Sequence, residues 1–146
     1  PGLVARIRGE GHEVGNHSFS HRHPWTLGER AARREVREGA GAITDVLGRA
    51  PRYFRPPHGR LRRCMLEEAR AHGEALVLWS RSAVDWGPWA RAAGIARRLA
   101  GANAGDIVLL HDGRARWNRP WETAAVLPAW LERLSARGLV PAALAL

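Results

Sequence analysis

Apolar runs and helix-like segments alternate along this chain, and this alternation constrains the fold more than any other feature of the sequence. The runs at 75–79 (ALVLW) and 106–111 (DIVLLH) are apolar at almost every position, which is typical of parallel strands that helices cover on both faces. Helical spacing of apolar residues fills the segments around them, which are 27–47, 61–72, 88–99 and 121–137. The pattern predicts an α/β fold with parallel strands, arranged as a sheet or as a barrel.

Weaker signals complete this pattern. We expect a short helix over 2–9, brief strands over 13–16 and 53–54, and a last strand over 139–144. No repeat, low-complexity tract or Ser/Gly-rich linker interrupts the 146 residues, so we expect a single domain over 1–146. Residue 1 is Pro and leads directly into a helix-like run, which predicts that the chain begins inside a larger domain.

Composition narrows the classes of partner. The formal net charge is +9 and every basic residue is Arg, so the surface could attract nucleic acid, anionic lipid or an acidic wall polymer. Because the arginines are spread over helix faces and not clustered with aromatic residues, we interpret them as solvated and predict no nucleic-acid partner. No apolar run approaches the ~20 residues that span a bilayer, which predicts no membrane segment. The lone Cys64 excludes an intrachain disulfide and is predicted to be a small buried apolar side chain.

Polar motifs follow four of the predicted strands. They are 17–21 (HSFSH), 55–59 (RPPHG), 85–86 (DW) and 109–112 (LLHD). Because the loops at the carboxyl ends of parallel strands converge and carry the chemistry of α/β barrels, we expect these motifs to share one end of the fold.

Each motif has a chemical interpretation and a simpler structural one. His17 and His21 are four residues apart, a spacing that lets two imidazoles reach one metal ion, although exposed or helix-capping histidines are common. The rigid Pro-Pro-His-Gly turn could hold the main-chain N–H of His58 as an oxyanion donor, or it could be an ordinary turn with Arg55 ion-paired at the surface.

The two later motifs are open in the same way. Trp86 offers a flat apolar wall that could pack on a sugar ring, or it could belong to the core. His111 ends an apolar run beside a carboxylate, where its pKa could suit general acid catalysis, or it could be a core histidine with its hydrogen bonds satisfied.

Together the four stretches resemble the motifs of the polysaccharide deacetylase family, the NodB-homology carbohydrate esterases. The matching residues are His17, Ser18 and His21 for the second motif of the family, Arg55, Pro57, His58 and Gly59 for the third, Asp85 and Trp86 for the fourth, and Leu109 and His111 for the fifth. The family's first motif, Thr-Phe-Asp-Asp-Gly-Pro, is absent. The resemblance therefore implies an incomplete distorted (β/α) barrel whose first strand-helix units lie upstream of Pro1.

The resemblance also implies an activity, namely metal-dependent hydrolysis of N-acetyl groups from a bacterial cell-wall or chitin-type glycan, with release of acetate. It assigns roles to nine residues: His17 and His21 bind a divalent metal, commonly zinc; His111 is the general acid, tuned by Asp85; Arg55 orients the catalytic base; the His58 N–H supports the oxyanion; and Trp86, Leu109 and Pro57 contact the substrate. The missing Asp pair would supply the third ligand and the base. The partner is then an N-acetylated glycan, and the full-length protein is expected at the cell envelope or outside the cytoplasm. A non-catalytic carbohydrate-binding pseudoenzyme is the alternative.

Overall fold

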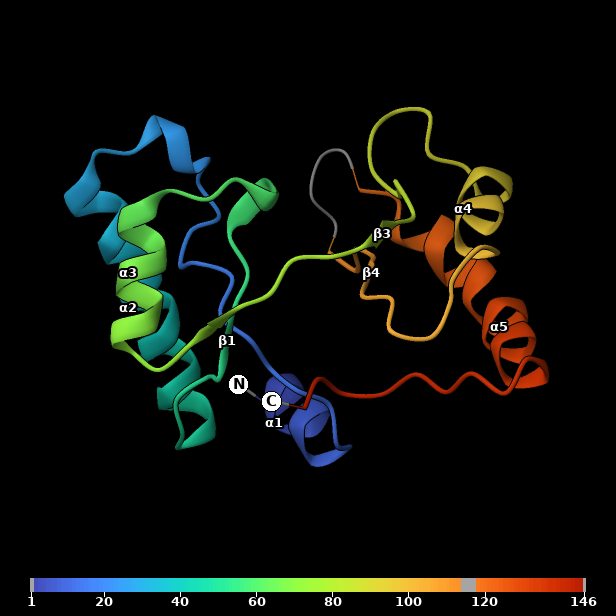
Figure 1. Ribbon diagram of the computed structural model, residues 1–146, viewed down its shortest axis with the longest axis horizontal. Coiled ribbons are helices and arrows are strands. Elements are labelled where there is room, and N and C mark those ends of the chain that lie inside the picture. Colours follow the sequence, from blue (N-terminus) through green and yellow to red (C-terminus); the bar gives the residue numbers. More distant parts are fainter. Residues whose placement is uncertain (1, 114–117, 146) are drawn as a thin grey trace. The chain divides into compact units, whose positions relative to one another are not determined.

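The chain forms two compact units, each with its own core and its own pair of parallel strands (Figure 1). The computed structural model describes residues 2–113 and 118–145. The first unit comprises residues 1–78 and 143–146, and the second comprises residues 79–142.

The first unit alternates helices with short strands. Its elements are α1 (Gly2–Gly9), the 3-10 turn η1 (Pro24–Thr26), α2 (Glu29–Leu47), β1 (Tyr53–Phe54), the 3-10 turn η2 (Pro57–Gly59), α3 (Arg63–Ala71) and β2 (Ala75–Leu76). Strands β1 and β2 run parallel, with Tyr53 opposite Ala75. Asn16 adds a one-residue parallel bridge to Phe54. The segments that follow Asn16 and Phe54 therefore leave this pairing at the same end.

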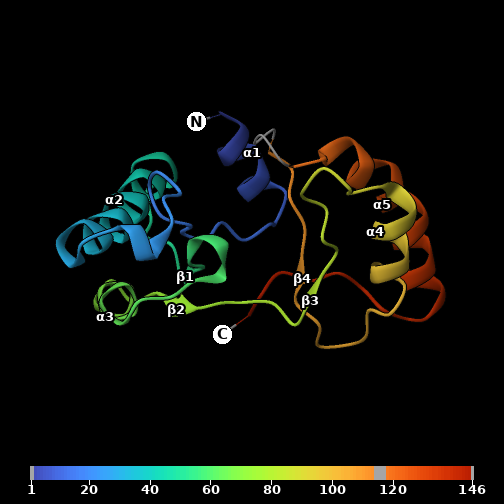
Figure 2. The same ribbon diagram turned by 90° about the horizontal axis from the view of Figure 1, so that it is seen from above.

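Helix α2 is the main wall of the first core. Its apolar residues Ala32 and Val36 are fully buried and pack with Phe54, Met65 and Ala69. The helix ends at Gly48, whose φ of 68° is the left-handed conformation that glycine adopts without strain, and whose N–H donates to the carbonyl of Thr44. Helix α3 lies alongside α2 (Figure 2). The sequence pattern thus predicted both helices.

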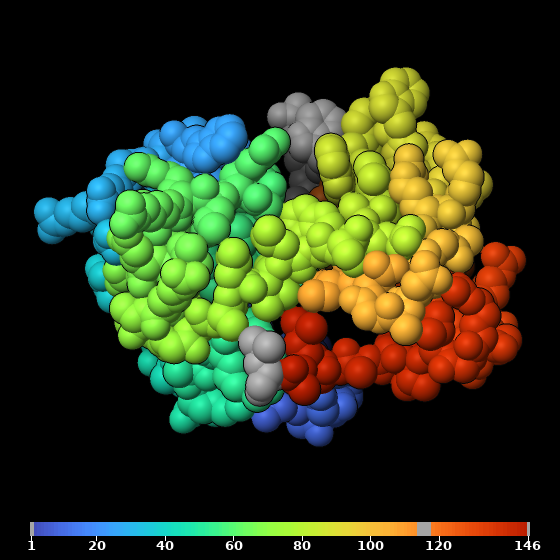
Figure 3. All heavy atoms as spheres, viewed as in Figure 1, coloured from blue at the N-terminus to red at the C-terminus, as the bar shows by residue number. Residues whose placement is uncertain are grey.

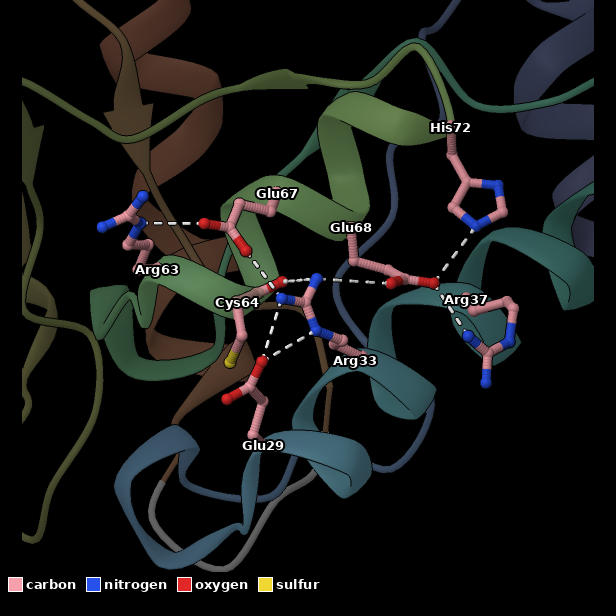
Figure 4. A network of polar contacts seen from close by, with 8 residues as sticks. All are labelled: Glu29, Arg33, Arg37, Arg63, Cys64, Glu67, Glu68 and His72. Atoms are coloured by element: carbon pink, nitrogen blue, oxygen red, sulfur yellow. Dashed lines mark hydrogen bonds and ion pairs between the residues drawn. The ribbon is translucent and has the colours of Figure 1, made fainter.

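The solvent side of the α2–α3 pair carries a network of ion pairs (Figure 4). Arg33 is the centre of this network because it contacts carboxylates on both helices and donates to the main-chain carbonyl of Cys64. The other members are Glu29, Arg37, Arg63, Glu67, Glu68 and His72. Such exposed pairs contribute little individually and weaken with salt. Cys64 itself is buried at 7% exposure, as predicted.

Three other arginines stack on aromatic rings. The guanidinium carbon of Arg52 lies 5.5 Å from the ring centroid of Tyr53. The corresponding distance is 5.1 Å from Arg60 to Trp25 and 5.5 Å from Arg119 to Trp121. These are cation–π distances.

The second unit repeats the same principle with two helices and two strands. Its elements are β3 (Arg81–Ser82), α4 (Ala92–Leu99), β4 (Val108–Leu109) and α5 (Pro120–Ala136). Strands β3 and β4 are parallel, with Ser82 opposite Leu109. Helices α4 and α5 pack side by side (Figures 1 and 2) around a core of Ala83, Ile95, Leu99 and Val126.

The strands are shorter and less buried than the sequence predicts. The run at 75–79 contains only the two-residue strand β2, and Leu76 and Leu78 are 37% and 42% exposed. The run at 106–111 contains only β4, whose residues are half-buried. Each named strand has one strand partner within the described part of the chain. An apolar run signals burial, but the run itself does not provide the neighbouring strand that burial requires.

Two further boundaries also differ from expectation. The predicted strand over 139–144 is wrong, because these residues form no strand, Val140 is 84% exposed and Pro141 has no N–H for a ladder. The helix expected over 88–99 begins at Ala92. Pro88 and Gly87 precede it, and Gly87 has a left-handed backbone conformation. None of the helices described is long and apolar enough to cross a membrane.

Candidate functional site

Each unit holds its own share of the predicted site residues. The first unit contains His17, His21, Arg55, Pro57 and His58, and the second contains Asp85, Trp86, Leu109 and His111. Within each unit the motif loops leave the same end of a parallel strand pairing. The two groups are therefore described separately.

The two histidines of the first motif lie close together. Their ring centroids are 4.9 Å apart, and the rings meet edge to face. The Nδ1 atom of His17 lies 2.6 Å from the main-chain oxygen of Arg55. Because a carbonyl can only accept, Nδ1 carries the proton and donates, which places the lone pair of the His17 ring on Nε2. Metal-binding histidines are usually oriented in this way by a carbonyl or carboxylate.

Helix α2 holds the loop that carries both histidines. The Glu35 carboxylate accepts hydrogen bonds from the main-chain N–H of Ser20 at 2.8 Å and from its hydroxyl at 2.5 Å. The carbonyl of Glu35 accepts from the N–H of Phe19. Burial alone would raise the pKa of Glu35, but the hydrogen bonds from Ser20 and Phe19 outweigh it and lower this pKa. The charged carboxylate of Glu35 on α2 thus fixes Ser20, the residue before His21.

Asn16 connects the same loop to three other elements. Its side-chain amide donates to the carbonyl of Val36 at 2.9 Å and to both carboxyl oxygens of Glu74, and its side-chain oxygen accepts from the N–H of Ser18. All the polar atoms of this buried side chain are therefore used.

A close approach of loop and helix makes Gly39 necessary. A Cβ atom at this position would lie 2.4 Å from the side-chain oxygen of Asn16 and 2.9 Å from the carbonyl carbon of Ser18. The loop itself contains two strained residues, because Ser18 and His21 have φ values of 65° and 56°. Such conformations persist only where the surroundings over-determine them. Here those surroundings are the contacts from α2.

His58 lies beside the histidine pair. It has a φ of 56°, and the next residue, Gly59, has a φ of 64°, so two successive left-handed residues turn the chain sharply after the prolines. The ring of His58 is 4.8 Å from that of His21 and 5.1 Å from that of His23, centroid to centroid. Burial lowers the pKa of His58, and the neighbouring charges of His21 and His23 lower it further. Its ring is therefore neutral at pH 7.

Arg55 and Pro57 are built into the first unit. The Arg55 guanidinium donates to the main-chain carbonyls of Val77 and Leu78, and burial lowers its pKa. Pro57 is fully buried. The two hydrogen bonds of Arg55 hold the chain just after β2.

In the second unit, a buried carboxylate, Asp85, pairs with the partly exposed His111. Asp85 is 0% exposed. One of its carboxylate oxygens lies 2.8 Å from His111 Nδ1, and the other accepts from the His111 main-chain N–H at 2.7 Å and from the Thr123 hydroxyl at 3.0 Å. Burial would raise the pKa of Asp85, but these hydrogen bonds and the charge of His111 together lower it. The carboxylate is ionised at pH 7, so His111 carries its proton on Nδ1 and presents Nε2 for proton transfer.

Trp86 and Leu109 adjoin this pair in the chain. Trp86 follows Asp85 directly and is 51% exposed, so the interpretation of Trp86 as a core residue is wrong. Leu109 ends β4 and is half-buried.

Sequence reasoning missed four residues that support the site: Asn16, Glu35, Gly39 and Thr123. Glu35 and Gly39 are four apart and so share one face of α2, the only hint that this helix has a second task. Thr123 lies in the first turn of α5, 38 residues after the carboxylate that it contacts, and nothing in the sequence connects the two.

Comparison with known proteins places this arrangement in a class. The sequence profile of the polysaccharide deacetylases matches residues 1–77. A carbohydrate esterase of family 4 from Streptomyces lividans, solved in complex with acetate, is 28% identical and superposes with a TM-score of 0.82 over 95% of this chain and 69% of that one. The fold is thus similar to that of a family 4 carbohydrate esterase.

Two curated relatives agree. A peptidoglycan-N-acetylglucosamine deacetylase of Listeria monocytogenes is 35% identical over 140 residues, which are 94% of this chain and 28% of the relative. A chitooligosaccharide deacetylase of Sinorhizobium fredii is 35% identical over 114 residues, covering 77% of this chain and 53% of that protein. The chain belongs to the polysaccharide deacetylase family, and it spans about 28% of the length of the first of these relatives.

Proposed function

We propose that this chain is part of a metal-dependent deacetylase that hydrolyses N-acetyl groups on a glycan and releases acetate. The observation that carries the proposal is the contact between Asp85 and His111, because a fully buried carboxylate that fixes the tautomer of a half-exposed histidine is what a general acid requires. A histidine held only for packing does not need an ionised partner.

The histidines of the first unit fit two of the ligand positions of a divalent metal such as zinc. His17 and His21 would be its ligands, because their rings approach each other and the orientation of His17 is fixed through Nδ1. When bound, the metal would polarise the acetamide and activate a water molecule. A catalytic zinc normally has three protein ligands, and within residues 2–113 and 118–145 no group of three His, Cys, Asp or Glu side chains is arranged to hold an ion. By family resemblance, the Asp pair of the first motif would complete the ligands and provide the base.

The remaining residues act on the substrate without the metal. His111 would donate a proton from Nε2 to the departing amine, and Asp85 would stabilise the charge that the imidazole carries before this step. The main-chain N–H of His58 would donate to the developing oxyanion. Trp86, Leu109 and Pro57 would form apolar contacts with the acetyl group and the sugar. Arg55 would orient the base of the first motif.

The barrel form of the fold and the location of the protein in the cell are part of the same proposal. We infer that the parallel strand pairs are parts of an incomplete distorted (β/α) barrel, and that the full-length protein works at the cell envelope or outside the cytoplasm. The names of the two curated relatives support an N-acetylated glycan of the peptidoglycan or chitin type as the substrate.

A non-catalytic carbohydrate-binding role is the second candidate. The observation in its favour is that the described residues supply two metal ligands and not three. This role would keep Trp86 and the apolar contacts but would not need the tautomer of His111 to be fixed.

Acetate release from N-acetylated chito-oligosaccharide separates the two functions. In a longer form of the protein that carries the first motif, His111→Ala should lower turnover by roughly 10²–10⁴ and leave metal content unchanged, as expected for loss of a general acid. His17→Ala should lose the metal. If both variants keep the metal and lose activity equally, the division of roles is wrong; if the longer protein releases no acetate, the binding role replaces catalysis.

A further inference from the structure

A row of ring contacts leads away from the histidine pair across the surface of the first unit. His21 contacts His58, His58 contacts His23, and the ring of His23 lies 5.7 Å from that of Trp25. The segments around residues 20 and 60 lie next to each other at the surface (Figure 3). The row thus connects the proposed metal ligands to an aromatic residue that none of the four motifs contains.

Trp25 ends this row as an exposed platform. It is 64% exposed, although it lies in a well-fixed turn. Pro24 before it is buried, and the main-chain N–H of Trp25 donates to Nδ1 of His23. An indole that is open to solvent and carried by a fixed turn is suited to stacking on a sugar ring.

Arg60 lies over this indole and provides a fixed positive charge. Its guanidinium carbon is 5.1 Å from the ring centroid of Trp25. A guanidinium in contact with a ring still carries N–H groups that match a planar anion in a bidentate way. The pair thus offers an aromatic surface and a donor for a carboxylate next to each other.

Seven other arginines in the described part of the first unit have carboxylate partners. The pairs are Arg6 with Glu10, Arg33 and Arg37 with acids on α2 and α3, Arg34 with Glu38, Arg49 and Arg52 with Glu13, and Arg63 with Glu67. Within the part of the chain that the structure describes, no carboxylate lies within ion-pair distance of Arg60. Among the described residues, the positive charge beside Trp25 thus has no ion-pair partner.

We propose that Trp25 and Arg60 form a subsite for a sugar that bears a carboxylate, so that the favoured substrate is an acidic N-acetylated glycan and not a neutral one. The inference rests on the proposed function, because it takes the histidine pair as the place where the acetamide is hydrolysed. Trp25 would stack on the apolar face of the sugar, and Arg60 would pair with its carboxylate. Neither residue contacts the reacting group.

Two glycans with the same backbone test this subsite. Chitotetraose is neutral, and the tetrasaccharide of alternating N-acetylglucosamine and N-acetylmuramic acid adds carboxylates to a similar chain of sugars. Calorimetric titration of the 146-residue chain should show at least ~10-fold tighter binding of the acidic glycan, the range for a charge-assisted hydrogen bond. Arg60→Gln should remove this preference and leave chitotetraose binding unchanged, and Trp25→Ala should weaken both. Arg60→Lys, which keeps the charge but not the planar fork, should recover only part of the preference.

The matched control is Arg30→Gln, an exposed arginine on α2, which should leave both affinities unchanged. Equal binding of the two glycans by the native chain, or equal losses for Arg60→Gln and Arg30→Gln, would overturn the subsite and leave the proposed function in place. If neither glycan binds to the native chain, the subsite and the proposed glycan site both fail.

Discussion

Glu74 should make the stability of the first unit fall as the pH rises. This carboxyl group lies just before β2, is 2% exposed, and has the amide of Asn16 as its hydrogen-bond donor. Burial raises its pKa from 4.5 to about 7, and the hydrogen bond from Asn16 only partly opposes this. The folded state therefore holds the proton more tightly than the unfolded chain does.

The sign and size of the effect follow from linkage. Below pH 4.5 the group is protonated in both states, and its contribution is fully present. Between pH 4.5 and about 7 the folded state binds more protons, so the free energy of unfolding decreases with rising pH; above this range both states are ionised and the loss is complete. At about 1.4 kcal/mol per pH unit, the total loss is on the order of 3 kcal/mol.

Glu74→Gln tests this reasoning because it keeps the shape and an acceptor for Asn16 but cannot ionise. Urea unfolding followed by circular dichroism from pH 4.5 to 8 should give equal stabilities at the acid end. At pH 8 the variant should be more stable by up to about 3 kcal/mol. Groups that titrate in both proteins cancel in the difference, and Glu38→Gln on the exposed face of α2 should show no such trend. A difference between native protein and Glu74→Gln that stays constant over this pH range would refute the argument.

Three further predictions concern the supports of the site. Gly39→Ala should lower the free energy of unfolding by about 1–3 kcal/mol and weaken binding of Co²⁺ by the histidine pair in titration, because its Cβ would meet Asn16. The control is Gly41→Ala on the same helix, which has open space and should stabilise the protein by about 0.5–1 kcal/mol. Similar effects from both substitutions would contradict the role of Gly39. Thr123→Val should leave one oxygen of Asp85 with a single donor and cost about 1–3 kcal/mol, with a shifted His111 signal in imidazole NMR; an unchanged signal would show that Thr123 does not position the pair. The chain alone should show little acetate release because it supplies two metal ligands, and robust, chelator-sensitive release would disprove this.

The sequence was most informative where contacts are local or follow a motif. His17 and His21 are four residues apart, and their rings do approach each other. Asp85 and His111 were expected at the same end of the fold, and they do lie together, although the strand that precedes Asp85 is β3 and not the apolar run at 75–79. The alternation of strands and helices predicted the parallel α/β arrangement in each unit.

The supports of the site could not be predicted, because they come from other elements. Glu35 lies 15 residues from Ser20, whose hydroxyl donates to its carboxylate, and Thr123 lies 38 residues from Asp85. A single sequence carries no signal for such pairs. The strand expected over 139–144 failed for a related reason: apolar residues indicate a preference for burial, but pairing depends on a partner strand that periodicity does not reveal.

Helix α2 joins two properties that could otherwise vary independently. The side chain of Val36 lies in the core, and its carbonyl holds Asn16; Glu35 and Gly39, on either side of it, hold the histidine loop. Mutations that change the packing of this helix should therefore also change the metal affinity that we propose for the histidine pair. Selection for a more heat-resistant variant through the α2 core would be expected to change catalytic performance at the same time, and screening should follow both properties together.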